Sequence, residues 1–265
     1  MRKSRTVWDF TDTWLDTLSI IIDAGSAVAP RGQPTLEILQ HTVAVDMRRP
    51  VLMSPSRKLS YAFMAAEAFW ILSGSDRVEH IAPYNANIAK FSDDGEVFFG
   101  AYGPKIVAQL DYVVDKLIAD NDSRQAGLTI WRENPPQSKD IPCTVAIFFS
   151  LRHDVVNAHV FMRSSDVWLG LPYDVFNFSM LAHQVCCRLY NAGVEVAPGN
   201  LYLTAASSHL YERDLDSAKE CLSKGVAAPI QNQTPQALYT GEPELFKTLE
   251  VLRGGYAAKH ARWWE

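Results

Sequence analysis

The chain has 265 residues, 48% of them hydrophobic, which is enough to bury a large core in a single domain spanning 1–265. Its net charge of −5 gives no general attraction to nucleic acid, and no run of about 18 apolar residues could span a membrane. Four cysteines without metal-ligand spacing or a disulfide pattern, and polar residues where a signal peptide would be apolar, favour a cytoplasmic enzyme.

The spacing of apolar residues predicts helices and strands in an irregular order. We expect a helix at 8–24, a loop at 25–34, one long strand or a strand pair at 35–47, and helices at 57–73 and 104–120. These are followed by strands at 126–133 and 143–163, a helix at about 174–191, a strand at 199–206 and a helix from about 210. Residues 143–163 should fold as a hairpin that turns near Arg152. Strands packed with helices, without βαβ alternation, favour an α+β fold.

Glu67 stands out inside the apolar helix predicted at 57–73. Phe63, Met64, Trp70 and Ile71 lie three and four residues away, so Glu67 points from an apolar helix face. A carboxylate there loses water, and its pKa should rise unless it is paired. Two interpretations stay open, a buried ion pair with a distant Lys or Arg and a proton shuttle.

Two short segments carry the strongest functional signal. The first runs from Arg163 to Asp174 as Arg-Ser-Ser-Asp-Val-Trp-Leu-Gly-Leu-Pro-Tyr-Asp, and the second is Pro-Cys-Thr with Cys143 at its centre. Both resemble the thymidylate synthase family, where they read Arg-Ser-x-Asp-x-x-Leu-Gly-Leu-Pro-Phe-Asn and Pro-Cys-His. This chain differs in Asp174 for asparagine and in Thr144 for histidine. The resemblance covers roughly 30–225 and points to the branch that modifies cytidylates, the pyrimidine-nucleotide hydroxymethylases.

The resemblance implies a fold and an assembly. The family has a mixed β-sheet covered by helices, with two sheets packed back to back in a homodimer. It also implies 5,10-methylenetetrahydrofolate as co-substrate, a pyrimidine nucleoside monophosphate as substrate, and no metal. Neither nucleic acid nor a membrane is expected as a partner.

Cys143 is the predicted nucleophile. Carbon 5 of a pyrimidine reacts with electrophiles only after a thiolate has added to carbon 6, and a thiolate forms more readily near a positive charge. Arg163 would supply that charge if the predicted hairpin brings it beside Cys143. The alternative, for a cysteine taken alone, is a buried structural residue.

Other residues of the expected site follow from the resemblance. Arg163 and Ser164 match the phosphate-binding pair, because arginine binds phosphate oxygens with a planar fork. Arg31 matches the arginine of a mobile phosphate loop, although the sequence around it is only partly kept. Arg124 matches the first of two adjacent arginines that the family lends across the dimer, and Gln125 replaces the second. A solvated surface charge is the alternative for any of these arginines in isolation.

The remaining matches concern the sugar, the proton at carbon 5 and the folate. Glu67 matches the family's catalytic glutamate, and Tyr102 matches the tyrosine that helps remove the carbon-5 proton. His209 and Tyr211 match the pair that holds the sugar 3′-hydroxyl. Arg57 corresponds to a basic residue at the folate glutamate tail, while Arg132 has no assigned partner. The segment that lines the nucleotide and folate site comprises Asp166, Leu169, Gly170 and Tyr173.

Asp174 is expected to select the base. Uracil presents an N3–H donor and an O4 acceptor, which one asparagine amide satisfies with its two ends. Cytosine presents a 4-amino donor and a bare N3, so a carboxylate accepts from the amino group, and from N3 once that nitrogen is protonated. Opposite uracil, the carboxylate would face O4 acceptor to acceptor. An aspartate favoured at a helix N-terminus by the helix dipole is the alternative reading.

The fate of the transferred carbon is less constrained. Where the synthases carry a tryptophan that shields the exocyclic methylene from water, this chain has residues 85–92 without tryptophan. The small apolar C-terminal tail of the synthases is also replaced, by a sequence ending in Trp263 and Trp264. We therefore expect a 5-hydroxymethyl product from deoxycytidylate, with cytidylate as the alternative sugar form. Two further alternatives are a cytidylate 5-methyltransferase, with Trp263 and Trp264 as the shield, and a non-catalytic relative that binds nucleotides or RNA.

Overall fold

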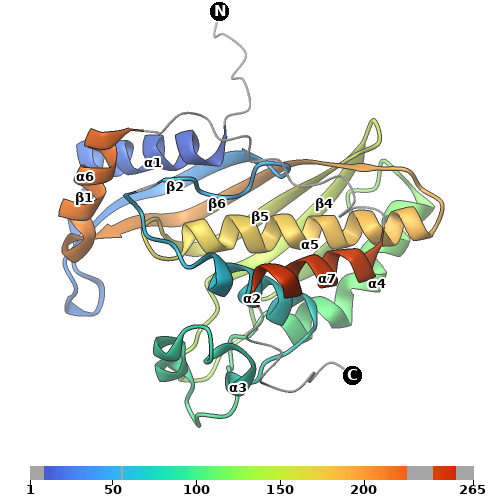
Figure 1. Cartoon of the computed structure of the whole chain (residues 1–265), viewed down its shortest axis with the longest axis horizontal. Helices are drawn as coiled ribbons and strands as arrows, with labels where there is room; N and C mark the ends of the chain where they lie inside the picture. The colour runs from blue at the N-terminus through green and yellow to red at the C-terminus, as the bar shows by residue number, and fades with distance from the viewer. Residues whose placement is uncertain (1–8, 55, 226–240, 255–265) are drawn as a thin grey trace, which may run out of the picture.

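A six-stranded mixed sheet organises the computed structural model, which describes residues 9–54, 56–225 and 241–254. The strands are β1 (Ser26–Val28), β2 (Thr35–Asp46), β3 (Gly127–Thr129), β4 (Thr144–Arg152), β5 (Val155–Asp166) and β6 (Ala197–Tyr211). Their order in the sheet is β1-β2-β6-β5-β4-β3 (Figure 1). The pair β5 and β6 runs parallel and the other neighbours run antiparallel, so the sheet is mixed.

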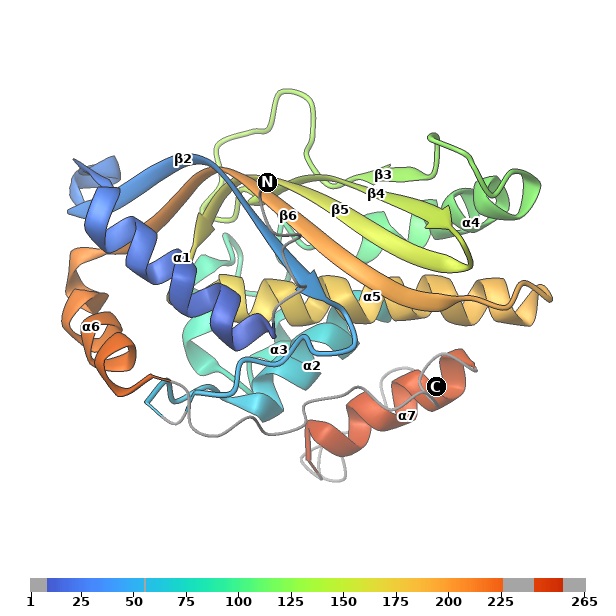
Figure 2. The ribbon, with the colours of Figure 1, turned by 90° about the horizontal axis from the view of Figure 1, so that it is seen from above.

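Helices cover one face of this sheet. The α-helices are α1 (Phe10–Ala24), α2 (Tyr61–Leu72), α3 (Val78–Ile81), α4 (Gly103–Ala119), α5 (Leu171–Asn191), α6 (Leu215–Lys224) and α7 (Glu242–Leu252). Short 3-10 turns η1 (Pro30–Gly32), η2 (Ala86–Phe91) and η3 (Glu212–Asp214) complete the elements. Figure 2 shows α1, α2, α5 and α7 on the same side of the sheet. This arrangement confirms the α+β prediction and matches the expected mixed sheet covered by helices.

Local chemistry explains where the elements begin and turn. The Asp9 side chain accepts a hydrogen bond from the Thr11 N–H at 2.9 Å and caps α1. Ser60 Oγ accepts from the Phe63 N–H at 3.2 Å, so α2 begins at Tyr61 rather than at the predicted 57. The hairpin between β4 and β5 turns at His153 and Asp154, whose φ angles of 50° and 60° are those of the turns that fit twisted hairpins.

Three sequence predictions need correction, and one open alternative is decided. The helix expected from about 210 is wrong, because β6 continues to Tyr211 and α6 begins only at Leu215. The strand predicted at 126–133 is shorter, since only β3 pairs with β4. Of the two alternatives for residues 35–47, the structure has the single long strand. Helix α5 begins at Leu171, three residues before the predicted start at about 174, because Pro172 fits in the first turn of a helix.

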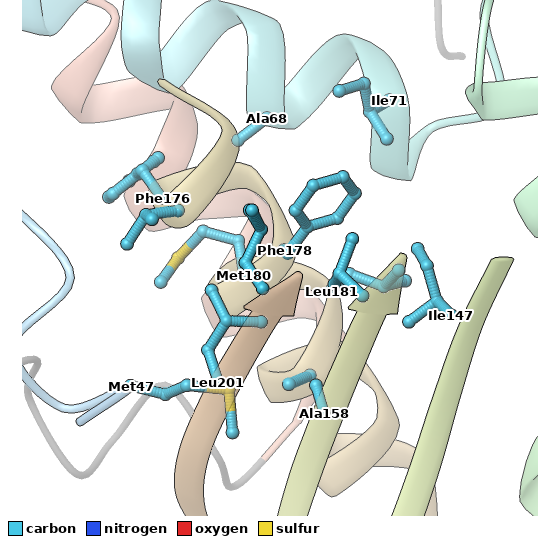
Figure 3. Close-up of a cluster of buried hydrophobic side chains, with 14 of the residues drawn as sticks. Met47, Ala68, Ile71, Ile147, Ala158, Phe176, Phe178, Met180, Leu181 and Leu201 are labelled. Carbon is cyan, nitrogen blue, oxygen red and sulfur yellow. The ribbon is translucent and has the colours of Figure 1, made fainter. Parts of the chain in front are cut away.

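The core lies between α5 and the sheet, with α2 on the far side of α5. Figure 3 shows Phe178 of α5 between Ala68 and Ile71 of α2 and Ile147 of β4. All four side chains are at least 94% buried. This layer fixes the N-terminal turns of α5 against α2, which is where the predicted site residues gather. No helix within the described residues combines the length and apolar character needed to cross a membrane.

Candidate active site

Cys143 lies just before β4, where the sheet pairing brings it to β5. Its Sγ is 3.8 Å from Ser164 Oγ, and its carbonyl accepts the Arg163 N–H at 2.8 Å. The Arg163 guanidinium turns back over the same segment and donates to the carbonyls of Pro142 and Ile141 at 3.0 and 2.9 Å. The hairpin therefore brings Arg163 and Ser164 to Cys143, as the sequence predicted.

The charge of Arg163 is not enough to make Cys143 a thiolate in the protein alone. Burial raises the pKa of the Cys143 thiol, the cation of Arg163 opposes this effect, and Asp174 adds to it. The pKa is raised overall, so the cation of Arg163 does not by itself outweigh the effect of burial on the thiol. Formation of a thiolate needs a base or a further positive charge close to the sulfur.

Glu67 and Asn177 form a polar contact between α2 and α5. Asn177 Nδ2 donates to Glu67 Oε2 at 2.8 Å. Burial raises the pKa of Glu67 to about 7, and the hydrogen bond from Asn177 opposes the rise. No Lys or Arg in the described part of the chain forms an ion pair with Glu67. The ion-pair interpretation therefore receives no support, and Glu67 can change its charge near neutral pH.

Asp174 occupies the first turns of α5 beside this contact. Burial raises its pKa well above the usual range, and the charges of Glu67 and Asp166 raise it further. The helix dipole does not outweigh these effects, although Asp174 lies in the dipole-favoured first turn. Two fully buried acidic side chains, Glu67 and Asp174, thus interact in one region of low dielectric, with Asp166 close enough to add to the effect on Asp174.

Tyr102 closes the region from the start of α4. Its hydroxyl accepts the Thr144 N–H at 3.3 Å, next to Cys143, and its ring stacks on Phe178 with 6.3 Å between centroids. Burial, followed by the charges of Asp174 and Cys143, raises the pKa of the Tyr102 phenol. The phenol is therefore protonated at neutral pH and can donate a hydrogen bond.

A tight turn between β5 and α5 carries the predicted folate-lining residues. Asp166 Oδ1 accepts from the N–H groups of Trp168 and Leu169, both at 2.9 Å, and so shapes the turn. Arg57 Nη2 donates to the Trp168 carbonyl at 2.9 Å, and its guanidinium stacks 4.6 Å above the Trp168 ring. Tyr173 accepts the Ser60 N–H at 3.3 Å. Arg57 thus supports the turn with donors that a ligand would otherwise use.

The end of β6 brings a second group of predicted residues together. His209 pairs with Asp166 of β5 and with Glu37 of β2, and its ring meets Tyr211 edge to face at 5.2 Å. Ser207 Oγ donates to Glu37 Oε2 at 2.5 Å. Burial lowers the pKa of His209, which the charges of Asp166 and Glu37 oppose and that of Arg31 reinforces. Arg31, at φ 54° in the exposed turn η1, therefore lies within electrostatic reach of His209.

Arg124 is not brought to this site. It is exposed in the loop between α4 and β3, where Arg152 donates to the carbonyls of Asn121 and Asp122 at 3.0 and 3.1 Å. Arg152 ends β4 and Cys143 precedes its start, so the length of this strand separates Arg124 from Cys143. Arg132 stacks over Phe99 at 4.4 Å. The predicted residues Trp263 and Trp264 lie outside the described residues.

Two functional candidates were missed by sequence reasoning. Asn177 interrupts an apolar helix three residues after Asp174, the spacing that places two side chains on one face. That spacing could have identified it. Glu37 has no comparable signal, because its approach to Ser207 depends on the pairing of β2 with β6. Within the described residues, no group of three or more His, Cys, Asp or Glu side chains is placed to hold a metal ion.

Comparisons with known proteins agree with this geometry. The family model described as thymidylate synthase matches residues 12–247. The deoxyuridylate hydroxymethyltransferase of Bacillus phage SP01 is 31% identical over 229 residues, which are 77% of this chain and 57% of the phage protein. The thymidylate synthase of Buchnera aphidicola subsp. Schizaphis graminum (strain Sg) is 24% identical over 255 residues, 88% of this chain and 93% of that enzyme. This chain thus spans little more than half the length of the phage relative.

The pKa of Glu67 predicts a pH-dependent cost to stability. Between the ordinary pKa of 4.5 and the raised value of about 7, the unfolded state ionises Glu67 while the folded state keeps it protonated. Stability is therefore lost as pH rises through this window. Replacing Glu67 with Gln, which resembles the protonated form, should leave stability unchanged at pH 4 and raise it by up to about 3 kcal/mol at pH 8. Urea unfolding across this range measures the effect; an equal change at both pH values would contradict it.

Proposed function

The chain belongs to the thymidylate synthase family, and from this premise we propose that it transfers a one-carbon unit from 5,10-methylenetetrahydrofolate to carbon 5 of a cytidine monophosphate. The favoured substrate is deoxycytidylate, and the favoured product is its 5-hydroxymethyl derivative. The observation that supports the proposal is the buried carboxyl group of Asp174 close to Cys143, Tyr102 and Glu67, at the position where the resemblance expects the base to be read.

Base recognition depends on the charge of Asp174. An ionised Asp174 accepts a hydrogen bond from the cytosine 4-amino group but faces O4 of uracil, acceptor against acceptor. A protonated Asp174 can pair with either base, because a neutral carboxyl group both donates and accepts. Its raised pKa therefore favours a second candidate, a uridylate hydroxymethylase. The name of the phage relative points the same way. Selectivity for cytosine should increase as pH rises and Asp174 ionises.

In this proposal each cluster of residues has one task. Cys143 adds through its sulfur to carbon 6, which makes carbon 5 nucleophilic. Arg163, Ser164 and Arg31 hold the phosphate through hydrogen bonds to its oxygens. His209 and Tyr211 hold the sugar. Glu67 and Tyr102 move protons at the ring, in a region where one acid changes charge near pH 7.

The folate would supply the electrophilic carbon when bound. The turn from Asp166 to Gly170 and the ring of Tyr173 would line the folate site. Leu169, within this turn, is 46% exposed and so offers an apolar surface to a ligand. Arg57 is the proposed contact for the glutamate tail, although its Nε and Nη2 already donate to the Trp168 carbonyl and its Nη1 to that of Lys58. The hydroxymethyl product is favoured by residues 85–92, where η2 replaces the shielding tryptophan of the synthases. The methyl product is the alternative.

A homodimer is part of the proposal. The face of the sheet opposite the helices exposes Phe148 and Phe161, which pack edge to face at 6.4 Å between ring centroids. Beside them, the half-buried rings of His159 and Tyr202 stack at 5.1 Å. Contiguous aromatic residues on a sheet face favour association. Arg124 lies a strand length away from its own Cys143, so it would reach a phosphate only in a partner subunit. A catalytic role is preferred over a purely nucleotide- or RNA-binding one, because Cys143, Glu67 and Tyr102 cluster together.

The product assay tests the function directly. The protein is incubated with deoxycytidylate, cytidylate or deoxyuridylate and 5,10-methylenetetrahydrofolate, and the products are separated and weighed by mass spectrometry. We expect 5-hydroxymethyl deoxycytidylate and tetrahydrofolate, with no dihydrofolate absorbance. Cys143→Ser should bind nucleotide but lose both turnover and exchange of the carbon-5 hydrogen with solvent. Dihydrofolate formed in step with nucleotide consumption would identify a methyltransferase instead.

Base choice should follow residue 174. Asp174→Asn should shift preference from cytidylate toward uridylate by about tenfold or more, because one buried hydrogen bond becomes mismatched. In the unchanged protein, kcat/KM for the cytidylate divided by kcat/KM for the uridylate should rise with pH. A preference for deoxyuridylate at every pH would assign the chain to the uridylate candidate.

Subunit mixing tests the placement of Arg124. Arg124→Glu and Cys143→Ser should each be inactive, and a mixture that has exchanged subunits should regain about a quarter of full activity. Each mixed dimer then contains one site with both Cys143 and the borrowed Arg124. No recovery after verified exchange would place Arg124 outside the partner's site.

A further inference from the structure

Asn177 contacts Glu67 from a fully enclosed position next to Asp174 in helix α5. Its side chain is 4% exposed, and Nδ2 donates to Glu67 Oε2 at 2.8 Å across the contact of α2 with α5. Asp174 lies one helical turn earlier on the same side of α5 and interacts electrostatically with Glu67. The Asn177 amide is therefore in direct contact with the carboxyl group whose charge changes.

The other end of this amide has no partner. Asn177 Oδ1 is buried and accepts no hydrogen bond from any described residue. An unsatisfied buried carbonyl is destabilising, whereas an apolar side chain of the same shape would avoid that cost. The amide therefore provides the hydrogen bond to Glu67, which an apolar residue at position 177 could not.

A side-chain amide can serve both charge states of a carboxyl group. With Glu67 ionised, Nδ2 donates to the carboxylate, as observed. With Glu67 protonated, rotation of the amide by half a turn presents Oδ1, which accepts from the Glu67 O–H. One polar atom of the amide stays unpaired in either orientation, so that cost does not select between the two states.

We propose that Asn177 is a positioning residue that turns its amide with the charge of Glu67, and so holds this carboxyl group in one place while it takes up and releases a proton. The role rests on the proposed function for Glu67, since a proton shuttle must keep its geometry in both states. The pKa of about 7 supports the role, because both charge states are then populated near neutrality.

Other charged or titratable groups near α2 do not replace this contact. They are Tyr173 and Asp174 in α5, Tyr102 at the start of α4, His80 in α3 and Arg253 after α7. Tyr173 and Asp174 interact with Glu67 through space. His80 is hydrogen bonded to Ser75, and Arg253 stacks on Phe69. Asn177 supplies the hydrogen bond to Glu67.

The same helix provides a matched control. Gln184 is 2% exposed, its Nε2 donates to Glu242 Oε1 at 2.7 Å, and its Oε1 has no partner among the described residues. This second pair lies between α5 and α7, two helical turns beyond Asn177. Glu242 is also paired with Arg188 at 3.0 Å. Gln184→Leu thus removes the same kind of contact without touching the site.

The test follows Glu67 and Asn177 by nuclear magnetic resonance in the full chain, with carboxyl carbons and side-chain amides labelled. Glu67→Gln assigns the Glu67 signal. The Asn177 amide signal should change with the same midpoint as Glu67, and should not titrate in Glu67→Gln. Asn177→Leu should raise the pKa of Glu67 by about 1, because the bond to the charged form is the stronger of the two. Asn177→Asp, which keeps the shape, should raise it further through like-charge repulsion.

Activity provides the second readout. The pH midpoint of carbon-5 hydrogen exchange should move with the pKa of Glu67 in both Asn177 variants and stay unchanged in Gln184→Leu. An Asn177 amide that ignores the Glu67 titration, or an equal shift in Gln184→Leu, would overturn the inference. Should Asn177→Leu fail to fold, the Asn177→Asp titration decides. Absence of exchange in the unchanged protein would reject the proposed function, while the resonance titration still decides the role of Asn177.

Discussion

The pairing of β5 with its two neighbours is the constraint on which the site depends. On one side, antiparallel β4 places Cys143 against Ser164, and on the other, parallel β6 places His209 against Asp166. Helix α5 then begins directly after the turn that ends β5. A slip of one residue in either register would point each of these side chains to the opposite face of the sheet. The places of Cys143, His209 and Asp174 are thus all set relative to the single strand β5.

The sequence was sufficient where local pattern and tertiary structure agree. Helices α1 and α4, the long strand β2 and the hairpin of β4 and β5 lie close to their predicted bounds, because apolar spacing and turn residues specify each of them. The helix predicted from about 210 failed because Ser207 to Tyr211 carry no strong strand signal of their own. These residues are held extended by β2 and β5 on either side. Pairing between distant segments overrode local preference there.

The sequence predicted which residues lie together in the candidate site better than it predicted how their pKa values shift. The motifs around Cys143 and Asp174 named side chains that the fold brings together. They did not reveal that burial outweighs Arg163 at the Cys143 sulfur, because desolvation depends on what the whole fold packs over the group. The rise in the pKa of Glu67 was predictable, since its apolar neighbours lie in its own helix. Two buried acids that interact, Glu67 and Asp174, oppose folding when they are ionised, and such local conflicts are typical of functional sites.

Hydrogen bonds within the protein hold the loop that carries Arg124. Arg152, at the end of β4, donates to two carbonyls of this loop, and the left-handed turn that follows fixes where β4 ends. In the proposed dimer, the backbone of this braced loop would lose little conformational entropy when the Arg124 side chain meets an anion. Loosening the hairpin of β4 and β5, for example by replacing Arg152, would then weaken phosphate binding without changing any residue that touches the phosphate.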